Sequence, residues 1–513
     1  MPGWGRYNVG CGDVSVATTG HRRPDRQQLP ASRKEPGMVA RSHVDDIARL
    51  REGQQAAFTA AGEVPVEERR RRLQQVIDLL VEYHEPLVEA MGADFGGRHP
   101  GYSLMNDILG SLGSLKHVRD HVASWMQPEA RTPFAPYDQL GAEAWVMYQP
   151  KGSVGIIGTW NAPLFTLLSP LACVLGAGNR AVLKPSELAP RTAEVLAGAV
   201  AERLDPAILG VVTGGVEIGA AFAAEPFDHL VFTGSTAVGR KVMAAAARNL
   251  VPVTLELGGK SPAILGRSAD LAEATRRLAL AKSTNSGQLC ISPDLLYVPR
   301  ERLEETLEGL KAAYAGFYPR TADNPDVVPI INDAHLARLD GYLDEVVRAG
   351  TRVETTPDEP IADDGRRRPL RLVVDPPRES RVMQEEIFGP LLVVLPYDEI
   401  DSVIDEINAR TRPLALYYFG EEAEEQRRVL GRTLSGGVTI NDALMHAAMH
   451  DAPFGGVGAS GMGHYHGREG FKAFSHMRTV FRAVDDDPRA DWGVLPPYGE
   501  GFLAAMKAQV VPE

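Results

Sequence analysis

The sequence predicts an α/β fold organised around a doubly wound parallel sheet, with a second α/β region after it. Between Gly152 and Leu257, short β-branched runs alternate with helical patterns, which is typical of βαβ units around a parallel sheet. After Lys260 the alternation continues with a new set of apolar runs. A chain of 513 residues is long enough for two or three domains.

The chain before the sheet divides into a leader and a set of helices. Residues 1–37 are rich in Arg, Gly, Pro and Gln, so we expect a disordered leader and take Met38 as the hypothetical start. Apolar residues recur every three or four positions from 45 to 87, which predicts amphipathic helices. Another helix is predicted over 103–126, and residues 144–148 alternate weakly, as in an exposed strand or hairpin arm.

The first α/β region contains five predicted strands. They cover residues 154–157, 181–183, 210–213, 229–233 and 253–257, with helices over 169–175, 191–203 and 237–247. A doubly wound sheet binds ligands at the carboxyl ends of its strands. At those ends lie Asn161, Lys184, Glu187 and the glycine-rich turn 234–239, which resembles a phosphate-binding turn that opens a helix.

The second region contains further apolar runs and helical patterns. The expected strands are 263–265, 295–298, 370–374 and 391–395, and the expected helices are 271–282, 302–315, 338–347 and 400–409. Residues 435–463 are rich in glycine, and the tail beyond Val480 has the composition of an extended arm.

Composition excludes several classes of protein. A net charge of −13 argues against a protein that wraps nucleic acid, and no apolar run approaches the roughly 18 residues of a membrane span. Cys11, Cys173 and Cys290 lack metal-type spacing and favour a reducing cytosol. We also predict no metal at His446 and His450, because no H-E-x-x-H motif accompanies them.

Cys290 is the candidate nucleophile. A free cysteine is most often a small buried hydrophobe. Here Asn285, Ser286 and Gln288 are poor core residues and Gly287 favours a bend. We therefore expect the thiol to face a polar cleft that raises its thiolate fraction.

Six short motifs carry a resemblance to a known family. They are Asn285-Ser-Gly-Gln-Leu-Cys290, Glu256-Leu-Gly-Gly-Lys260, Thr159-Trp160-Asn161, Lys184-Pro-Ser-Glu187, Glu385-Glu-Ile-Phe-Gly-Pro390 and Pro453-Phe-Gly-Gly456. In this order and spacing the chain resembles the aldehyde dehydrogenase superfamily. Residues 456–463 with Tyr465-His-Gly467 are most similar to its class 3 and coniferyl aldehyde dehydrogenase branch.

The resemblance implies an aldehyde dehydrogenase-like fold with three parts. Residues 38–130 and 150–255 would form the dinucleotide-binding domain, and residues 256–440 the catalytic domain. Residues 131–149 and 441–513 would form a small β oligomerisation flap and C-terminal arm. A cytoplasmic homodimer or dimer of dimers is implied as well.

The resemblance also assigns catalytic roles. Cys290 would add to an aldehyde, Asn161 would stabilise the oxyanion, and Glu256 would activate the water that hydrolyses the thioester to the acid. Burial would raise the pKa of Glu256 towards the working range. Taken alone, Asn161 would equally be a helix cap, and Glu256 more often a solvated surface charge.

NAD is the expected cofactor, with NADP as the alternative. Lys184 and Glu187 resemble the adenosine-ribose ligands, and a carboxylate there repels a 2′-phosphate. The resemblance places Gly234, Ser235 and Gly239 at the pyrophosphate. It places Glu386, Phe388 and Trp160 around the nicotinamide and its ribose. The competing class is a cofactor-independent cysteine esterase or thioesterase, or a silent scaffold.

Two positions depart from the family pattern. Ala162 and Ser283 stand where the family commonly has aromatic residues, which predicts a wider pocket and tolerance of bulky or aromatic aldehydes. The alternative is that Met445 or Phe165 fills the vacated volume.

Overall fold

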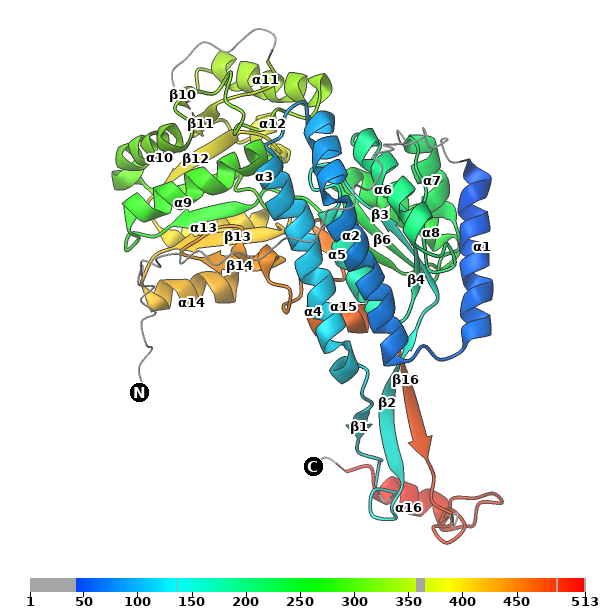
Figure 1. Ribbon diagram of the computed structural model, residues 1–513. Coiled ribbons are helices and arrows are strands. Elements are labelled where there is room, and N and C mark those ends of the chain that lie inside the picture. Colours follow the sequence, from blue (N-terminus) through cyan, green and yellow to red (C-terminus); the bar gives the residue numbers. More distant parts are fainter. Residues whose placement is uncertain (1–42, 136, 357–364, 486–487, 512–513) are drawn as a thin grey trace, which may run out of the picture. The chain divides into compact units, whose positions relative to one another are not determined.

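The computed structural model describes residues 43–135, 137–356, 365–485 and 488–511. The expected leader 1–37 and the hypothetical start Met38 lie outside these residues. Within the described part of the chain, three sheets and their helices form the fold (Figure 1).

The first sheet has six strands in the order β15-β7-β6-β3-β4-β5. Its strands are β3 (Ser153–Ile157), β4 (Arg180–Lys184), β5 (Leu209–Val211), β6 (His229–Gly234), β7 (Val253–Leu257) and β15 (Gly461–Met462). The first five are parallel and confirm the five predicted strands, with ends shifted by one or two residues. The sixth, β15, pairs antiparallel with β7, opposite Glu256, although it falls in the range expected for the flap.

Alternation along the central strands explains why helices cover both faces of this sheet. Ile156 and Leu183 belong to one apolar core, whereas their neighbours Ile157 and Val182 belong to another. Side chains of a strand alternate between faces, so each face needs its own cover. The first core is closed by α2 (Val66–Phe95), α4 (Gly110–Trp125), α5 (Phe165–Gly176) and α6 (Pro190–Arg203). The second is closed by α1 (Val44–Ala61), α7 (Val216–Ala224) and α8 (Thr236–Ala247).

The second sheet has seven strands in the order β10-β11-β12-β9-β8-β13-β14. Its strands are β8 (Pro262–Leu265), β9 (Leu295–Pro299), β10 (Arg352–Thr356), β11 (Leu370–Val374), β12 (Leu391–Tyr397), β13 (Ala415–Phe419) and β14 (Gly437–Ile440). All neighbours are parallel except β10, which runs antiparallel to β11. The four predicted strands are confirmed, whereas β10, β13 and β14 were not predicted.

Helices alternate with these strands. They are α9 (Leu271–Ser283), α10 (Leu303–Phe317), α11 (Asp333–Arg348), α12 (Arg381–Gln384), α13 (Ile400–Ala409) and α14 (Ala423–Arg432). The first three and α13 confirm the four predicted helices. The fourteenth helix is strongly charged, with a single buried residue, Val429, so it lacked the apolar stripe that identifies a helix in a sequence.

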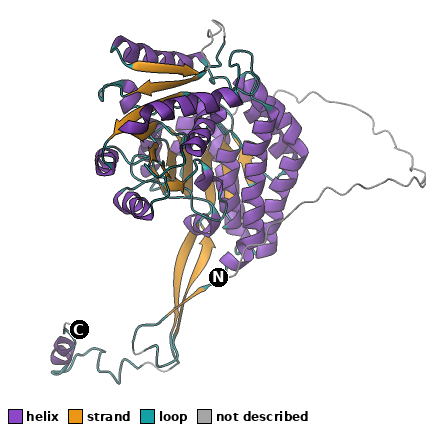
Figure 2. Cartoon of the chain, turned by 90° about the vertical axis from the view of Figure 1, so that its left-hand side faces the viewer, coloured by secondary structure: helices purple, strands orange, loops and turns teal. Residues whose placement is uncertain are grey.

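The third sheet is a small ribbon that extends from the two larger sheets (Figure 2). It consists of β1 (Glu129–Arg131), β2 (Glu143–Pro150) and β16 (Ser475–Arg482). The expected strand at 144–148 is confirmed as part of β2, which pairs antiparallel with β16 along its full length. The tail after β16 is not wholly extended, since it contains α16 (Phe502–Ala508).

None of the helices in the described ranges is long and apolar enough to cross a bilayer.

Candidate active site

The carboxyl ends of the parallel strands bring most of the predicted residues to one edge of the first sheet. Asn161 follows β3, Lys184 ends β4, and Ser235 follows β6. Glu256 lies at the carboxyl end of β7, directly opposite Thr233 of β6. This is the edge at which doubly wound sheets bind ligands.

The nucleophile segment is a strained turn. After α9, a 3-10 turn (Thr284–Gly287) places Asn285 and Ser286 in the left-handed region, at φ 51° and 53°. This conformation costs a side-chain-bearing residue roughly 1–2 kcal/mol. The fully buried Gln288 holds the turn, because its Nε2 donates to the carbonyls of Asn285 and Pro329, both at 3.1 Å. The predicted bend before Cys290 is therefore confirmed.

Cys290 is partly exposed, and a hydrogen bond to the next residue in the chain fixes its loop. The buried Tyr417 hydroxyl donates to the carbonyl of Ile291 at 2.5 Å. Burial raises the pKa of the thiol far above its usual value, and the charges of Glu386 and Glu256 raise it further. The expectation of a raised thiolate fraction is wrong, since two carboxylates, rather than cations, lie within electrostatic reach of the sulfur.

Asn161 lies beside the nucleophile segment, and it is not a helix cap. Helix α5 begins four residues later, with Leu164 at its N-cap position. The Asn161 side chain is buried, and its Nδ2 donates to the carbonyl of Gln288 at 2.9 Å. An amide nitrogen carries two hydrogens, so a second N–H is left for a ligand.

An ion pair that sequence reasoning missed holds the Asn161 turn. Arg98 and Asp107 are fully buried and bonded to each other, and Arg98 Nη1 donates to the carbonyl of Asn161 at 3.1 Å. Asp107 lies in a π-helical segment (Leu104–Leu109) and accepts the backbone N–H of Leu164 at 3.1 Å. π-Helical turns are often found at functional sites. Neither residue carries a sequence motif, because their pairing exists only in the fold.

Glu256 is buried, and neither carboxylate oxygen has a hydrogen-bond partner in the described structure. Burial raises its pKa well above 4.5, and only the backbone N–H of Gly456 opposes the shift. The expectation of a raised pKa is confirmed, and the surface-charge alternative is excluded. Raising the pKa of a carboxyl by burial makes its ionised form a stronger general base.

Glu386, Phe388 and Trp160 form a second cluster near the sulfur. Burial, aided by the charge of Asp294, raises the pKa of Glu386 to about 8. One of its carboxylate oxygens is buried without a partner, and its carboxylate lies against Gly258 where no Cβ would fit. The rings of Phe388 and Trp160 meet edge to face at 5.3 Å.

The remaining predicted cofactor residues lie at two other strand ends. Lys184 is buried and its Nζ donates to Glu187 Oε2 at 3.0 Å. Ser235 is exposed and caps α8, where its Oγ accepts the N–H of Val238 at 3.3 Å. A Cβ on Gly239 would lie 2.6 Å from Leu257, so glycine lets α8 pack on β7.

These residues fit a dinucleotide. The first turn of α8, where Ser235 caps the N–H of Val238, suits a pyrophosphate, because a helix N-terminus presents further N–H groups to an anion. The unpartnered oxygen of Glu386 suits a ribose hydroxyl.

The two departures from the family pattern have different surroundings. Ser283 is buried, and the phenol of Tyr318 lies beside it. The volume expected to be open at Ser283 is thus taken by Tyr318 from the end of α10, a residue that was not foreseen. Ala162 is itself buried. Met445 is half exposed, and the Phe165 ring packs over Gly110 and edge-on against His466 at 6.0 Å.

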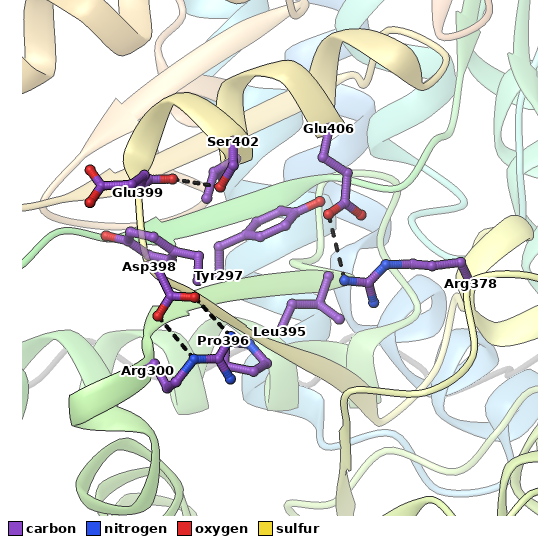
Figure 3. Close-up of a pocket in the computed structure, with 11 residues that line it drawn as sticks. Tyr297, Arg300, Arg378, Leu395, Pro396, Asp398, Glu399, Ser402 and Glu406 are labelled. Atoms are coloured by element: carbon purple, nitrogen blue, oxygen red, sulfur yellow. Dashed lines mark hydrogen bonds and ion pairs between the residues drawn. The ribbon is translucent and has the colours of Figure 1, made fainter.

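A separate pocket of about 410 Å³ opens at the carboxyl ends of β9 and β12, beside α13 (Figure 3). It is lined by Tyr297, Arg300, Arg378 and Glu406, among others, and by none of the predicted site residues. Its arginines face carboxylates, with Arg300 bonded to Asp398 at 2.9 Å. The pocket therefore offers no nucleophile and no uncompensated cation.

Comparisons with known proteins agree with this geometry. The model of the aldehyde dehydrogenase family matches residues 21–480. A coniferyl aldehyde dehydrogenase from a Pseudomonas species is 47% identical, over 88% of this chain and 94% of the relative. The solved structure of Staphylococcus aureus AldH in its substrate-bound state has a TM-score of 0.83 and 33% identity, covering 91% of this chain and 99% of that chain. An aldehyde dehydrogenase of Mycobacterium tuberculosis complexed with NAD+ has a TM-score of 0.78 and 29% identity, covering 88% and 94%.

The unpaired Glu256 leads to a prediction about stability. Folded Glu256 keeps its proton to a higher pH than unfolded Glu256, so above about pH 4.5 folding binds protons and stability falls as pH rises. Glu256→Gln removes this loss, which amounts to roughly 1.4 kcal/mol for each pH unit up to the folded pKa. We expect the melting temperature of Glu256→Gln to exceed that of the wild type at pH 8 and the difference to shrink towards pH 5.

The matched control is Glu89→Gln, on the exposed face of α2, which should follow the wild type at every pH. A constant difference between Glu256→Gln and the wild type across this range would contradict the buried, unpaired state of Glu256.

Proposed function

The chain belongs to the aldehyde dehydrogenase family and oxidises an aldehyde to the carboxylic acid with NAD(P), and we propose that Cys290, Asn161 and Glu256 carry out this chemistry. One observation carries the proposal. A buried carboxylate without a partner lies within electrostatic reach of a partly exposed thiol, and the amide of Asn161 is bonded to the same nucleophile segment.

In the first half of the reaction, the Cys290 thiol loses its proton to solvent, and the thiolate sulfur adds to the aldehyde carbonyl. The oxygen then carries negative charge, which the free N–H of Asn161 and the backbone N–H of Cys290 stabilise. Loss of one such donor typically costs about 2.7–4 kcal/mol of transition-state stabilisation. The dinucleotide, when bound, supplies the acceptor for the hydride that leaves this carbon.

In the second half, Glu256 takes a proton from water, which attacks the Cys290 thioester and releases the acid. Its raised pKa suits this role, because a carboxylate with a higher pKa is a stronger base. A cofactor-independent esterase would need the same three residues. It would have no use for the unpaired oxygen of Glu386 or for the exposed helix N-terminus at Ser235, which favours the dehydrogenase.

For the cofactor, we assign the adenosine ribose to Lys184 and Glu187 and the pyrophosphate to the turn at Gly234, Ser235 and Gly239. We assign the nicotinamide end of the dinucleotide to Glu386, Phe388 and Trp160. The carboxylate of Glu187 favours NAD, whereas its bond to the Lys184 ammonium offsets part of the repulsion of a 2′-phosphate. NAD is therefore the proposed cofactor, with NADP tolerated.

The proposed substrate is a bulky aromatic aldehyde of the coniferyl aldehyde type. The small Ala162 follows Asn161 directly, and the ring of Phe165 packs over Gly110 and against His466. Segments anchored near the site also carry exposed apolar side chains that would form an apolar rim. These are Met105, Leu109, Leu280, Met445 and Met449. The relative named for coniferyl aldehyde supports the same class.

A cytoplasmic homodimer or dimer of dimers is the proposed assembly, formed through the β2–β16 ribbon. The end of the ribbon carries exposed aromatic rings, with Phe134 within 4.9 Å of Tyr137 and Tyr137 within 5.2 Å of Trp492. Exposed apolar clusters of this kind mark interfaces. The two thiols of the described chain, Cys173 and Cys290, are not bonded to each other, as in a reducing compartment.

Site variants should separate the two half-reactions when NADH is followed at 340 nm with an aldehyde. Asn161→Ala should lower the rate of NADH formation by about 10²–10³, because it removes an oxyanion donor. Glu256→Gln should give a burst of one NADH per site and then slow turnover, because the thioester is no longer hydrolysed. Cys290→Ala should give none.

Two controls accompany these variants. Asn249→Ala and Glu89→Gln change the same residue types at exposed positions and should keep wild-type rates. Steady ester hydrolysis by the wild type, with no NADH from any aldehyde, would instead favour the cofactor-independent esterase.

The substrate proposal is tested at Ala162. Wild-type kcat/KM should be higher for coniferyl aldehyde than for propanal, with the acid products measured by chromatography. Ala162→Phe should lower kcat/KM for coniferyl aldehyde about tenfold, because a ring refills the space, and leave propanal within twofold. A wild type that clearly prefers propanal would rule out the bulky-aldehyde class.

A further inference from the structure

The buried carboxylate of Asp294 lies at the junction of the segments that carry the candidate site. Asp294 follows Cys290 by four positions, and its backbone N–H donates to Ser261 at 2.9 Å while its carbonyl accepts from Val393 at 3.1 Å. We propose that Asp294 is a positioning residue that holds the loop carrying Glu386 in the geometry that binds the nicotinamide ribose. This inference rests on the role proposed for Glu386.

The side chain of Asp294 contacts three charged or polar groups, one from each of three segments. Its Oδ2 accepts the backbone N–H of Ile387 at 2.8 Å, which lies between Glu386 and Phe388. Its Oδ1 lies 3.2 Å from the Nζ of Lys282, on the last turn of α9 before the nucleophile segment. Hydrogen bonds to an ionised carboxylate are about twice as strong as neutral ones, so the bond from the Ile387 N–H fixes the loop firmly.

Lys260 forms the third contact with Asp294 and also bonds to the backbone of the loop before Glu386. Its Nζ lies 3.4 Å from Asp294 Oδ2 and donates to the carbonyls of Val382 at 2.8 Å and Glu385 at 2.9 Å. Lys260 is four positions after Glu256. The carboxylate of Asp294 therefore connects the segment of the proposed base to the loop that carries Glu386. These contacts use backbone groups of the loop, and they leave the carboxylate of Glu386 free for a ligand.

Arg338 holds the loop from α11, and its Nη1 donates to the carbonyl of Ile387 at 2.7 Å. The peptide groups of Ile387 are therefore bonded on both sides, by Asp294 at its N–H and by Arg338 at its carbonyl. Phe388, the next residue, has a φ of 46°, a conformation that a bulky side chain adopts only when its surroundings impose it.

The charge of Asp294 acts on Glu386 as well. It is the second cause, after burial, of the raised pKa of about 8, while Lys260 and Arg338 lower it. The other charged or titratable groups that interact with Glu386 are Lys282 and Cys290. Removing the charge of Asp294 should therefore lower the pKa of Glu386. The ionised form accepts ribose hydroxyls more strongly, so the affinity for a dinucleotide should follow this titration.

The test is NADH binding to Asp294→Asn, measured by fluorescence from pH 6.5 to 9.5. At pH 9.5 Glu386 is ionised in both proteins, so a loosened loop alone should raise the Kd about tenfold, or 1.4 kcal/mol. The midpoint of the affinity change, near pH 8 in the wild type, should move to lower pH. Alkylation of Cys290 by iodoacetamide at pH 9.5 without cofactor should stay within twofold, because Glu386 is then ionised in both proteins and acts equally on the thiol.

Two further variants serve as references for NADH binding to Asp294→Asn. Asp228→Asn makes the same change at a half-buried carboxylate that accepts the N–H of Ser153 at 2.8 Å, and it should leave the Kd within twofold. Glu386→Gln should weaken NADH binding at pH 9.5 and abolish the midpoint. If it does not, the role proposed for Glu386 fails, and the inference about Asp294 fails with it.

Other outcomes decide the inference about Asp294 by itself. A Kd of Asp294→Asn within twofold of the wild type at pH 9.5, with Glu386→Gln impaired, would overturn it. So would equal losses of NADH binding and Cys290 alkylation, which indicate a general structural role. If Asp294→Asn does not fold, Lys260→Met carries the test by the same criteria, with the midpoint moving to higher pH.

Discussion

Burying the carboxylate of Glu256 without a partner is the constraint on which the site depends. A cation beside it would stabilise the fold, but it would also hold the carboxylate ionised and lower its pKa. The fold instead places it at the end of β7, between β6 and β15, where only the N–H of Gly456 approaches. The proton on Glu256 and the thiol of Cys290 are consequently coupled, because each negative charge disfavours the other.

The geometry around this pair is held by backbone contacts from distant segments. Gln288 fixes the strained turn, its carbonyl receives the Asn161 amide, and the Arg98–Asp107 pair supports Asn161 from the opposite side. Asp294 supports the loop of Glu386 in a similar way, because its carboxylate accepts the backbone N–H of Ile387. Polar groups that are buried and satisfied in this way leave few alternative arrangements, which is how a fold positions reactive groups.

Much of this architecture follows from sequence patterns, and the exceptions have physical reasons. The five strands of the first sheet are short apolar runs between turns, so their periodicity identifies them. By contrast, β10 is a polar edge strand, and β14 is a four-residue strand that begins with a glycine in a glycine-rich stretch. The raised pKa of Glu256 was predicted because its motif implied burial. The raised pKa of Cys290 was not, because it depends on burial of the thiol and on Glu386, which lies 96 positions away along the chain and meets the thiol only in the fold.

The coupling between Glu256 and Cys290 is the central claim, and the pH dependence of Cys290 alkylation tests it most directly. Iodoacetamide reacts with the thiolate, so its rate reports the thiol pKa without cofactor or substrate. Because Glu256 raises that pKa, the rate profile of Glu256→Gln should shift to lower pH than that of the wild type. Coincident profiles, or a shift to higher pH, would show that the carboxylate does not act on the sulfur and would contradict the account.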